Sequence, residues 1–279
     1  MASVTKRISE IKQPRGGYIK PSEFETIIID DGITLNEKEN IHGSIIGITV
    51  DYLTRFCMGT EIQEAFKISL LGATIAHDLG LKETLDIAGK LLKGIKGIDD
   101  DSITNACKLV TFDIWKRNPL GATMAKNYKE INPDKPTIQN IQTLVKRSMA
   151  FFEKYGPVTD DGFTFGPVKE DTSAYEKMLK TGNGSYGGYT AIVSSGDGDF
   201  LTEDTLWDFK VSKTKPTNKH TLQLLMYWIM GQHSGQEKYK KITKLGIFNP
   251  RLNTVYLLHI KNIPEDIIKT VEKEVICYE

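Results

Sequence analysis

The stretch GDGDFLTEDTLWDFKV, residues 196–211, decides how the fold is interpreted. Two β-like runs, Asp199–Thr202 and Thr205–Ser212, are separated by only two residues, so we expect a tight hairpin. Residues i and i+2 of a strand point to the same face, and Asp208 and Lys210 should therefore project together. The hairpin would bring Asp199 alongside them.

These side chains have the chemistry of a hydrolytic metal site. The carboxylates of Asp199 and Asp208 and the backbone carbonyl of Phe209 are oxygen ligands of the kind that Mg²⁺ or Mn²⁺ prefers. Lys210 would orient or deprotonate an attacking water, or stabilise charge on a phosphate. An acid-x-Lys pattern alone is weak evidence, since residues 10–12 also have it. The β-rich flanks and the upstream Asp give the pattern its weight here.

The segment after the hairpin predicts an amphipathic helix over Thr217–Gln232. Gln223 and Tyr227 lie four residues apart and so share one helical face, which should emerge beside the strand that carries Asp208 and Lys210. A Gln-x-x-x-Tyr pair by itself usually marks an ordinary helix surface. Its place directly after an Asp-x-Lys strand is what makes it informative.

A Gly-x-x-Asp segment, a hydrophobic-Asp-x-Lys strand and a Gln-x-x-x-Tyr helix, in this order, resemble the RecB-like branch of the PD-(D/E)XK nucleases. The resemblance covers residues 189–260, about a quarter of the chain. It implies a restriction-endonuclease-like fold, metal binding by Asp199 and Asp208, and a catalytic Lys210. It also implies that Gln223 and Tyr227 line the site and help to place DNA.

The family also carries a Gly-x-x-His or acidic motif on an upstream helix. The nearest match is Gly47-Ile48-Thr49-Val50-Asp51, which makes Asp51 a further metal-ligand candidate by resemblance and departs from the usual His. An exposed helical Asp next to Arg55 at i+4 explains Asp51 equally well, and Glu61 or Glu64 are other candidates for this role.

Local charge is more informative than the total, because 36 basic and 36 acidic residues cancel. Residues 155–209 hold ten acids against three lysines, whereas residues 210–251 hold nine basic residues against one acid. Clustered carboxylates bind a cation and adjacent lysines attract phosphates, so the nucleic-acid contacts expected are Lys213, Lys215, Lys219 and His220. Two oppositely charged, solvated surfaces are the alternative.

Periodicity divides the chain into an extended lead-in at 1–42, a helical region at 43–155 and a strand-rich segment at 156–279. The helical region is expected to contribute to and cover the core, and the resemblance implies that residues 156–279 form the nuclease core. Helices are predicted at Gly43–Cys57, Glu61–Ala76, Lys82–Ile95, Ser102–Lys116, Thr137–Tyr155, Asp171–Lys180 and Pro264–Cys277. Besides the hairpin, strands are predicted at Thr26–Ile29, Tyr189–Ser194, Ile242–Phe248 and Thr254–Ile260. The fold class expected is therefore α/β (α+β), a mixed central sheet flanked by helices with a largely helical N-terminal part.

Composition is that of an ordinary globular protein, with 39% hydrophobic and 26% charged residues. The chain has neither a long apolar run nor a secretory signal, so we expect a cytoplasmic protein without a membrane partner. Some relatives bind an iron–sulfur cluster through four cysteines. With three cysteines (Cys57, Cys107 and Cys277) this chain should lack one. No GxxxxGK[ST] loop is present, so a helicase or ATPase would be a separate chain.

Three functional interpretations follow. The first is an active Mg²⁺- or Mn²⁺-dependent deoxyribonuclease, for which we expect exonuclease or single-strand and end-processing activity in a phage, mobile-element, recombination or defence setting. The second is a catalytically inactive nuclease-fold module that binds nucleic acid or serves as a subunit of a larger DNA-processing complex. The third is an interaction protein without a nucleic-acid role, in which the helical region makes the contacts.

Overall fold

The computed structural model describes residues 2–122, 127–167 and 185–279, and the chain divides into two compact units. Unit one comprises Met1–Ile29, Tyr155–Lys210 and Thr214–Glu279, and unit two comprises Asp30–Lys154 and Val211–Lys213. The hairpin and the helix that follows it belong to unit one. The helix predicted at Asp171–Lys180 lies outside the described residues.

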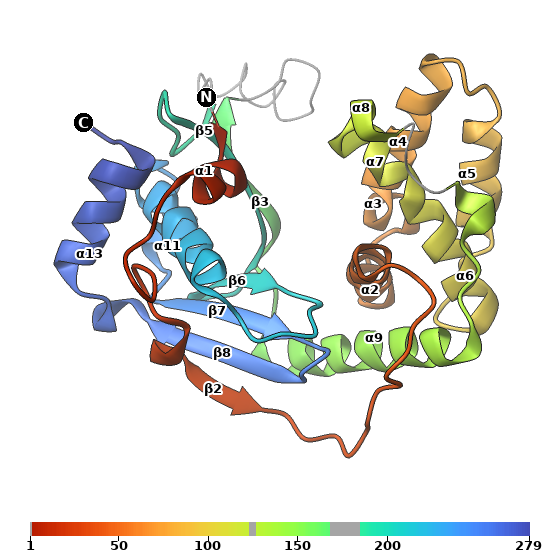
Figure 1. Cartoon of the computed structure of the whole chain (residues 1–279), viewed down its shortest axis with the longest axis horizontal. Helices are drawn as coiled ribbons and strands as arrows, with labels where there is room; N and C mark the ends of the chain where they lie inside the picture. Colours follow the sequence, from red (N-terminus) through yellow and green to blue (C-terminus); the bar gives the residue numbers. More distant parts are fainter. Residues whose placement is uncertain (1, 123–126, 168–184) are drawn as a thin grey trace. The chain divides into compact units, whose positions relative to one another are not determined.

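Unit one is built on a mixed eight-stranded sheet with the order β2-β8-β7-β6-β5-β3-β4, and β1 pairs with β5 (Figure 1). The pairs β6–β7 and β1–β5 are parallel, and the other pairs are antiparallel. A parallel pair needs a crossover connection, and α11 (Asn218–His233) lies between β6 and β7 in the chain. The strands are β1 (Ala2–Ser3), β2 (Glu25–Ile28), β3 (Asp160–Pro167), β4 (Ser185–Gly187), β5 (Val193–Leu201), β6 (Thr205–Phe209), β7 (Lys244–Asn249) and β8 (Thr254–His259).

The predicted hairpin is present as β5 and β6, which are joined by a short turn. Phe200 pairs with Trp207 and Leu201 with Leu206, and the amide of Thr202 donates to the carbonyl of Thr205 at 3.0 Å. The turn is reinforced because the indole Nε1 of Trp207 donates to Thr202 Oγ1 at 2.9 Å. The prediction of separate strands before and after residue 196 was wrong, since β5 continues through both glycines of the GDGD segment.

Two aromatic side chains of β3 pack closely against two glycines of β5, and this packing stabilises the pairing of the two strands. Phe163 and Phe165 of β3 pair with Gly198 and Gly196 of β5, and a Cβ added at Gly198 would lie 1.8 Å from Phe163 Cζ. The aromatic rings therefore occupy the space that side chains on β5 would need. The sequence of β3, rich in Gly, Asp and Pro, looks like a loop, and no strand was predicted there.

Helix α11 packs against β6 and β7, and its apolar side chains enter the main core of unit one. Leu222, Leu225 and Met226 are fully buried there. Helix α1 (Val4–Glu10) packs on α11 and adds Val4 and Ile8 to the same core (Figure 1). The extended lead-in predicted for the N-terminus is thus wrong over α1, where the Ser3 side chain accepts from the amide of Lys6 as an N-cap.

The C-terminal part of unit one is also helical. The predicted helix at 264–277 is present as α13 and a following π-helical segment. The short elements of unit one are a 3-10 turn (Pro21–Glu23), α12 (Glu237–Lys240), a second 3-10 turn (Ile260–Asn262), α13 (Glu265–Thr270) and the π segment (Val271–Ile276).

Unit two is helical, as predicted for the middle of the chain. Two predicted helices are each interrupted, one near Phe66 and one by a 3-10 turn at Val110–Phe112. Its helices are α2 (Gly43–Cys57), α3 (Ile62–Ala65), α4 (Lys67–Asp78), α5 (Thr84–Lys93), α6 (Asp100–Leu109), α7 (Asp113–Arg117), α8 (Pro119–Ala122) and α9 (Lys135–Tyr155), with a 3-10 turn at Tyr128–Glu130.

A buried polar cluster organises unit two around Asp113, which is 2% exposed. Its carboxylate accepts hydrogen bonds from Tyr52 Oη at 2.7 Å and Ser69 Oγ at 2.5 Å, and Arg117 lies at 3.5 Å. Burial raises the pKa of Asp113 in spite of these donors. The cluster ties α2, α4 and α7 together and has a structural role.

The fold class is α/β, with a mixed sheet flanked by helices. The helices among the described residues all lack the combination of length and apolar composition that crossing a bilayer requires.

Candidate functional site

The hairpin brings Asp199 and Asp208 together at the end of β6. The β5–β6 register pairs Phe200 with Trp207, and these are the chain neighbours of Asp199 and Asp208. The backbone amide of Phe209 donates to Asp199 Oδ2 at 2.6 Å. The Asp199 carboxylate is therefore held directly against the peptide that follows Asp208.

Lys210 completes the cluster. Its Nζ donates to Asp208 Oδ1 at 2.7 Å, and the Asp208 side chain is only 4% exposed. Burial pulls the pKa of Lys210 down, but the charges of Asp208 and Asp199 outweigh burial and leave the pKa raised. Both carboxylates therefore act electrostatically on one ammonium group.

The polar face of α11 meets this cluster. Gln223 Nε2 donates to Tyr227 Oη at 3.0 Å, and Tyr227 Oη donates to the carbonyl of Asp197 at 2.6 Å. Burial raises the pKa of Tyr227, and the charges of Asp208 and Asp199 raise it further. Tyr227 therefore remains a neutral hydroxyl at ordinary pH, and the structure brings together all five residues predicted for the catalytic site.

Two supporting features were not predicted. The carbonyl of Asp197 anchors Tyr227, and main-chain oxygens carry no signal in a sequence. Gly196 is required for the approach of this ring, because a Cβ there would lie 3.0 Å from Tyr227 Cε1 and 2.9 Å from Val4 Cγ2. The two glycines of GDGD thus fit the strand against its aromatic neighbours.

Tyr227→Phe should lower the free energy of unfolding by about 1–2 kcal/mol, because it leaves the carbonyl of Asp197 and the amide of Gln223 without their partner. Tyr239→Phe is the matched control, since the buried hydroxyl of Tyr239 has no hydrogen-bond partner among the described residues. That control should be neutral or stabilising. Urea denaturation of both variants measures the difference, and equal losses would contradict the assignment.

His220 lies on the first turn of α11 and is half-buried. Its Nδ1 accepts a hydrogen bond from the amide of Thr217 at 3.2 Å. Burial, and after it the charge of Lys210, lowers the pKa of His220 to about 4. His220 is therefore neutral at pH 7.

The lowered pKa predicts how stability depends on pH. Between pH 6.5 and about 4 the unfolded chain binds a proton at His220 and the folded chain does not, so unfolding becomes easier as pH falls through this range. His220→Gln removes this contribution. The loss of unfolding free energy from pH 7 to pH 5 should be smaller in the variant by about 1 kcal/mol. Urea titrations at both pH values test this, and an equal loss would contradict it.

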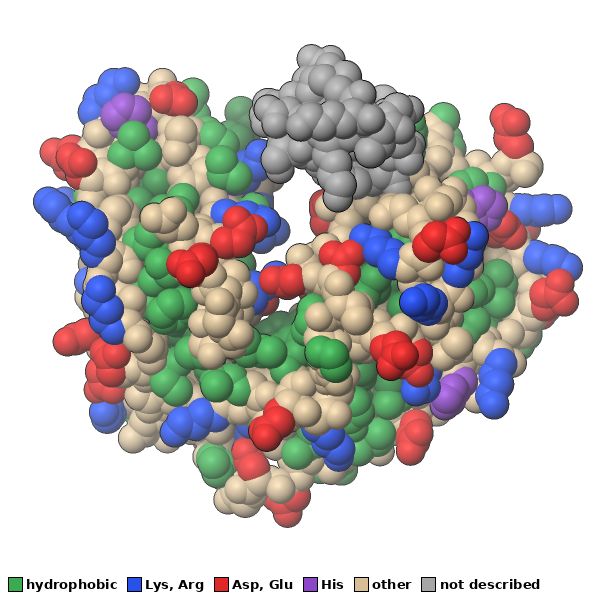
Figure 2. Space-filling model, turned by 180° about the vertical axis from the view of Figure 1, so that it is seen from behind, with side chains coloured by type: hydrophobic (Ala, Val, Ile, Leu, Met, Phe, Trp, Pro, Cys, Tyr) green, Lys and Arg blue, Asp and Glu red, His purple; other side chains and the backbone are tan. Residues whose placement is uncertain are grey.

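The predicted nucleic-acid contacts fall in both units. Lys215 and Lys219 are exposed in unit one. Lys213 belongs to unit two, where its Nζ lies 3.4 Å from Glu39 Oε2. Figure 2 shows Lys and Arg side chains interspersed with Asp and Glu on the face it displays.

Asp51, the metal ligand suggested by resemblance alone, also belongs to unit two. It lies on α2, and Arg55 Nε donates to its Oδ1 at 2.9 Å, which is the i,i+4 pair that its sequence position allows.

The donor set suits a hard cation. Asp208 Oδ2 is buried and has no hydrogen-bond partner among the described residues, and such an oxygen calls for a ligand or a cation. Carboxylate and carbonyl oxygens fit Mg²⁺ or Mn²⁺. Within 2–122, 127–167 and 185–279, no three or more His, Cys, Asp or Glu side chains are grouped so as to hold a metal. The hairpin itself offers two carboxylates, and a backbone oxygen or water would complete the coordination.

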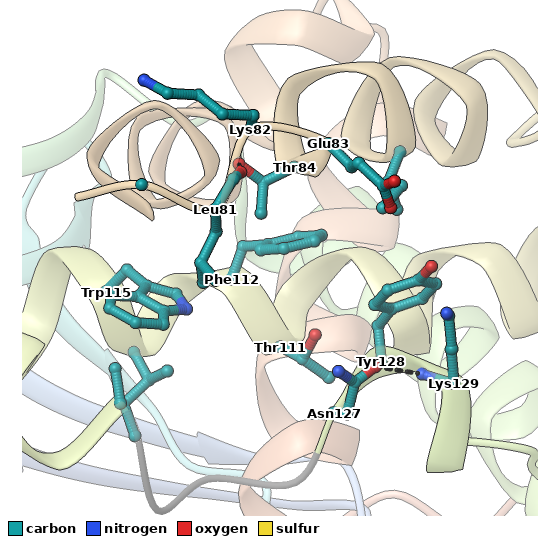
Figure 3. Close-up of a pocket in the computed structure, with 14 residues that line it drawn as sticks. Leu81, Lys82, Glu83, Thr84, Thr111, Phe112, Trp115, Asn127, Tyr128 and Lys129 are labelled. Carbon is teal, nitrogen blue, oxygen red and sulfur yellow. Dashed lines mark hydrogen bonds between the residues drawn. The ribbon is translucent and has the colours of Figure 1, made fainter. Parts of the chain in front are cut away.

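A cavity among the described residues has a different character. It has a volume of about 630 Å³ and lies within unit two. Figure 3 shows Phe112, Trp115 and Tyr128 among its lining residues, and Glu83 carries the one carboxylate among the described residues that line it. Its lining lacks the convergent acids found on the hairpin, so the hairpin is the stronger candidate for chemistry.

Neither a protein-family model nor a curated protein nor a solved structure matches the chain.

Proposed function

We propose that this protein is a metal-dependent nuclease that hydrolyses phosphodiester bonds in DNA. The observation that carries the proposal is the convergence of Asp199, Asp208 and Lys210 on one end of the β5–β6 hairpin. Two carboxylates placed against one lysine suit both a divalent cation and the phosphate that it would bind. The mixed sheet flanked by helices is compatible with the nuclease-like fold that the resemblance implies.

The metal would be held by the carboxylates of Asp199 and Asp208 and by the carbonyl of Phe209. When bound, Mg²⁺ or Mn²⁺ supplies a Lewis acid that lowers the pKa of water and offsets charge on the phosphate. The amide of Phe209 holds the Asp199 carboxylate in place at 2.6 Å. Asp208 Oδ2 has no hydrogen-bond partner in the described part of the chain, while Lys210 engages Oδ1.

Lys210 and the polar face of α11 would handle the substrate. The ammonium of Lys210 lies next to both carboxylates and is placed to neutralise a phosphate oxygen. Gln223 and Tyr227 are linked by a hydrogen bond and fixed to the backbone of β5, so their polar atoms are held rigidly. Rigid polar groups position a strand at little entropic cost.

The substrate is proposed to be DNA by resemblance, with a preference for ends or single strands. Lys215 precedes α11 and Lys219 lies in its first turn, and their exposed side chains suit contacts to a phosphate backbone. A helicase, an ATPase or a recombination protein would be a separate partner chain.

The test uses the full chain with labelled linear duplex, circular duplex and single-stranded DNA, in Mn²⁺, in Mg²⁺ and in EDTA. We expect products in Mn²⁺ or Mg²⁺ and none in EDTA. A double variant, Asp199→Asn with Asp208→Asn, purified in the same way, controls for contaminating nucleases and should be inactive.

The absence of products from every substrate would overturn the proposal, and so would equal cleavage by the double variant. DNA binding that persists in EDTA without cleavage in Mn²⁺ would instead favour a nuclease-fold binding module.

A further inference from the structure

We propose that His220 is a neutral hydrogen-bond donor that binds a backbone phosphate of the substrate next to Lys210. This inference rests on the proposed function and gives a specific role to His220, which the sequence predicts only as a nucleic-acid contact. It assigns to His220 a defined tautomer and a defined ligand, an anionic phosphate oxygen.

The tautomer follows from one hydrogen bond. A backbone amide can only donate, so Nδ1 of His220 must accept the bond from the amide of Thr217. A neutral imidazole carries one proton, and that proton is therefore on Nε2. The capping interaction thus leaves His220 with an N–H group as its second polar atom.

The position of His220 gives that N–H group a role. His220, Gln223 and Tyr227 are spaced i, i+3 and i+7 on α11 and so share one face of the helix. Tyr227 Oη donates to the carbonyl of Asp197, two residues before Asp199, which fixes this face of α11 to the strand that carries Asp199. His220 lies about two turns nearer the N-terminus of the same helix. In keeping with this placement, the charges of Asp208 and Asp199 act on Tyr227, and the charge of Lys210 acts on His220.

A nucleic-acid strand bound along this face would place successive phosphates near these groups. The phosphate that meets the carboxylates through a metal would lie nearest Tyr227, and a neighbouring phosphate would meet Lys210 and His220. A neutral donor is useful beside Lys210, because a second positive charge there would be repelled by the ammonium. A hydrogen bond to an anionic oxygen is stronger than one between neutral groups.

The competing explanation is that His220 only caps α11. Gln and Glu at this position are nearly isosteric with each other, and together they separate acceptance of the cap hydrogen bond from donation to a phosphate. In His220→Gln the side-chain oxygen can accept from the amide of Thr217, while the side-chain NH₂ still donates. In His220→Glu one oxygen keeps the cap, as a capping box does, but no donor remains. His220→Leu removes both the cap acceptor and the donor without adding charge.

The experiment measures KM and kcat for Mn²⁺-dependent cleavage of a labelled single-stranded oligonucleotide, and Kd for the same oligonucleotide in Ca²⁺. His220→Gln should stay within about threefold of the wild type, and His220→Glu and His220→Leu should raise KM and Kd by about 10-fold or more. The kcat should change less than KM. Urea denaturation measures the contribution of the cap to the free energy of unfolding, which should be the same in His220→Glu and His220→Gln.

Wild-type values of KM and Kd in His220→Leu would overturn the inference, and so would equal losses in the Gln and Glu variants. Failure of the proposed function looks different. In that case the wild type yields no products, and the inference about phosphate binding is then judged on Kd alone. An oligonucleotide that does not bind the wild type would overturn this inference as well.

Discussion

Asp208→Asn should reduce Mn²⁺-dependent DNA cleavage by roughly a thousandfold or more. The substitution keeps the size of the side chain but removes the charge from the most buried carboxylate of the hairpin, which is 4% exposed. It takes away one cation ligand and the partner of Lys210 together. Initial cleavage rates of the wild type and the variant, at saturating Mn²⁺, measure the effect.

Asp204→Asn is the matched control. Asp204 precedes the same strand, β6, and is also paired with a lysine, since Lys244 Nζ lies 2.8 Å from its Oδ2. It lies outside the hairpin cluster and is more exposed, at 43%. Its variant should cleave within a few-fold of the wild type, and equal losses in both variants would show that the effect is structural rather than catalytic.

Gly198→Ala should lower the free energy of unfolding by about 3 kcal/mol or more. The added Cβ would lie 1.8 Å from Cζ of Phe163, and this ring is 2% exposed and packed against Tyr227 at a centroid distance of 5.5 Å. The ring also packs against Tyr239 at a centroid distance of 6.1 Å, so its movement would displace β3 or these aromatic neighbours. Cleavage should also fall, because Asp199 follows Gly198 directly.

Gly89→Ala tests whether this effect comes from crowding. Gly89 lies inside α5, and a Cβ there would meet nothing within 4 Å. Alanine is the better helix former, so the control should be neutral or slightly stabilising. Thermal denaturation of both variants gives the comparison, and a Gly198→Ala protein as stable as the wild type would contradict the packing described for β3 and β5.

The sequence predicted the long helices well because their apolar periodicity is strong. Helix α2 occupies the predicted range, Gly43–Cys57, and α9 begins only two residues before the predicted start. The hairpin, β7 and β8 were also predicted, since β-branched and aromatic residues alternate there.

The missed elements owe their structure to tertiary contacts. Strand β3 is stabilised by the packing of Phe163 and Phe165 against the glycines of β5, and a composition rich in Gly, Asp and Pro conceals it. Helix α1 has only seven residues, too few for a clear period, and is held by the core contacts of Val4 and Ile8.

The candidate site was predictable where spacing determines geometry. Residues two apart on a strand and four apart on a helix must share a face, which placed Asp208 with Lys210 and Gln223 with Tyr227. Contacts to the backbone were not predictable. The bond from the Phe209 amide to Asp199 and the anchoring of Tyr227 on the carbonyl of Asp197 depend on how the strands meet.

A manganese soak of a crystal of the protein tests the central claim most directly. We predict an anomalous peak at bonding distance from the carboxylates of both Asp199 and Asp208, with the carbonyl of Phe209 in the same coordination sphere. A peak elsewhere would contradict the account. The absence of a peak after a soak in saturating Mn²⁺ would also contradict it, if Lys210 still bonded to Asp208 and the amide of Phe209 still bonded to Asp199.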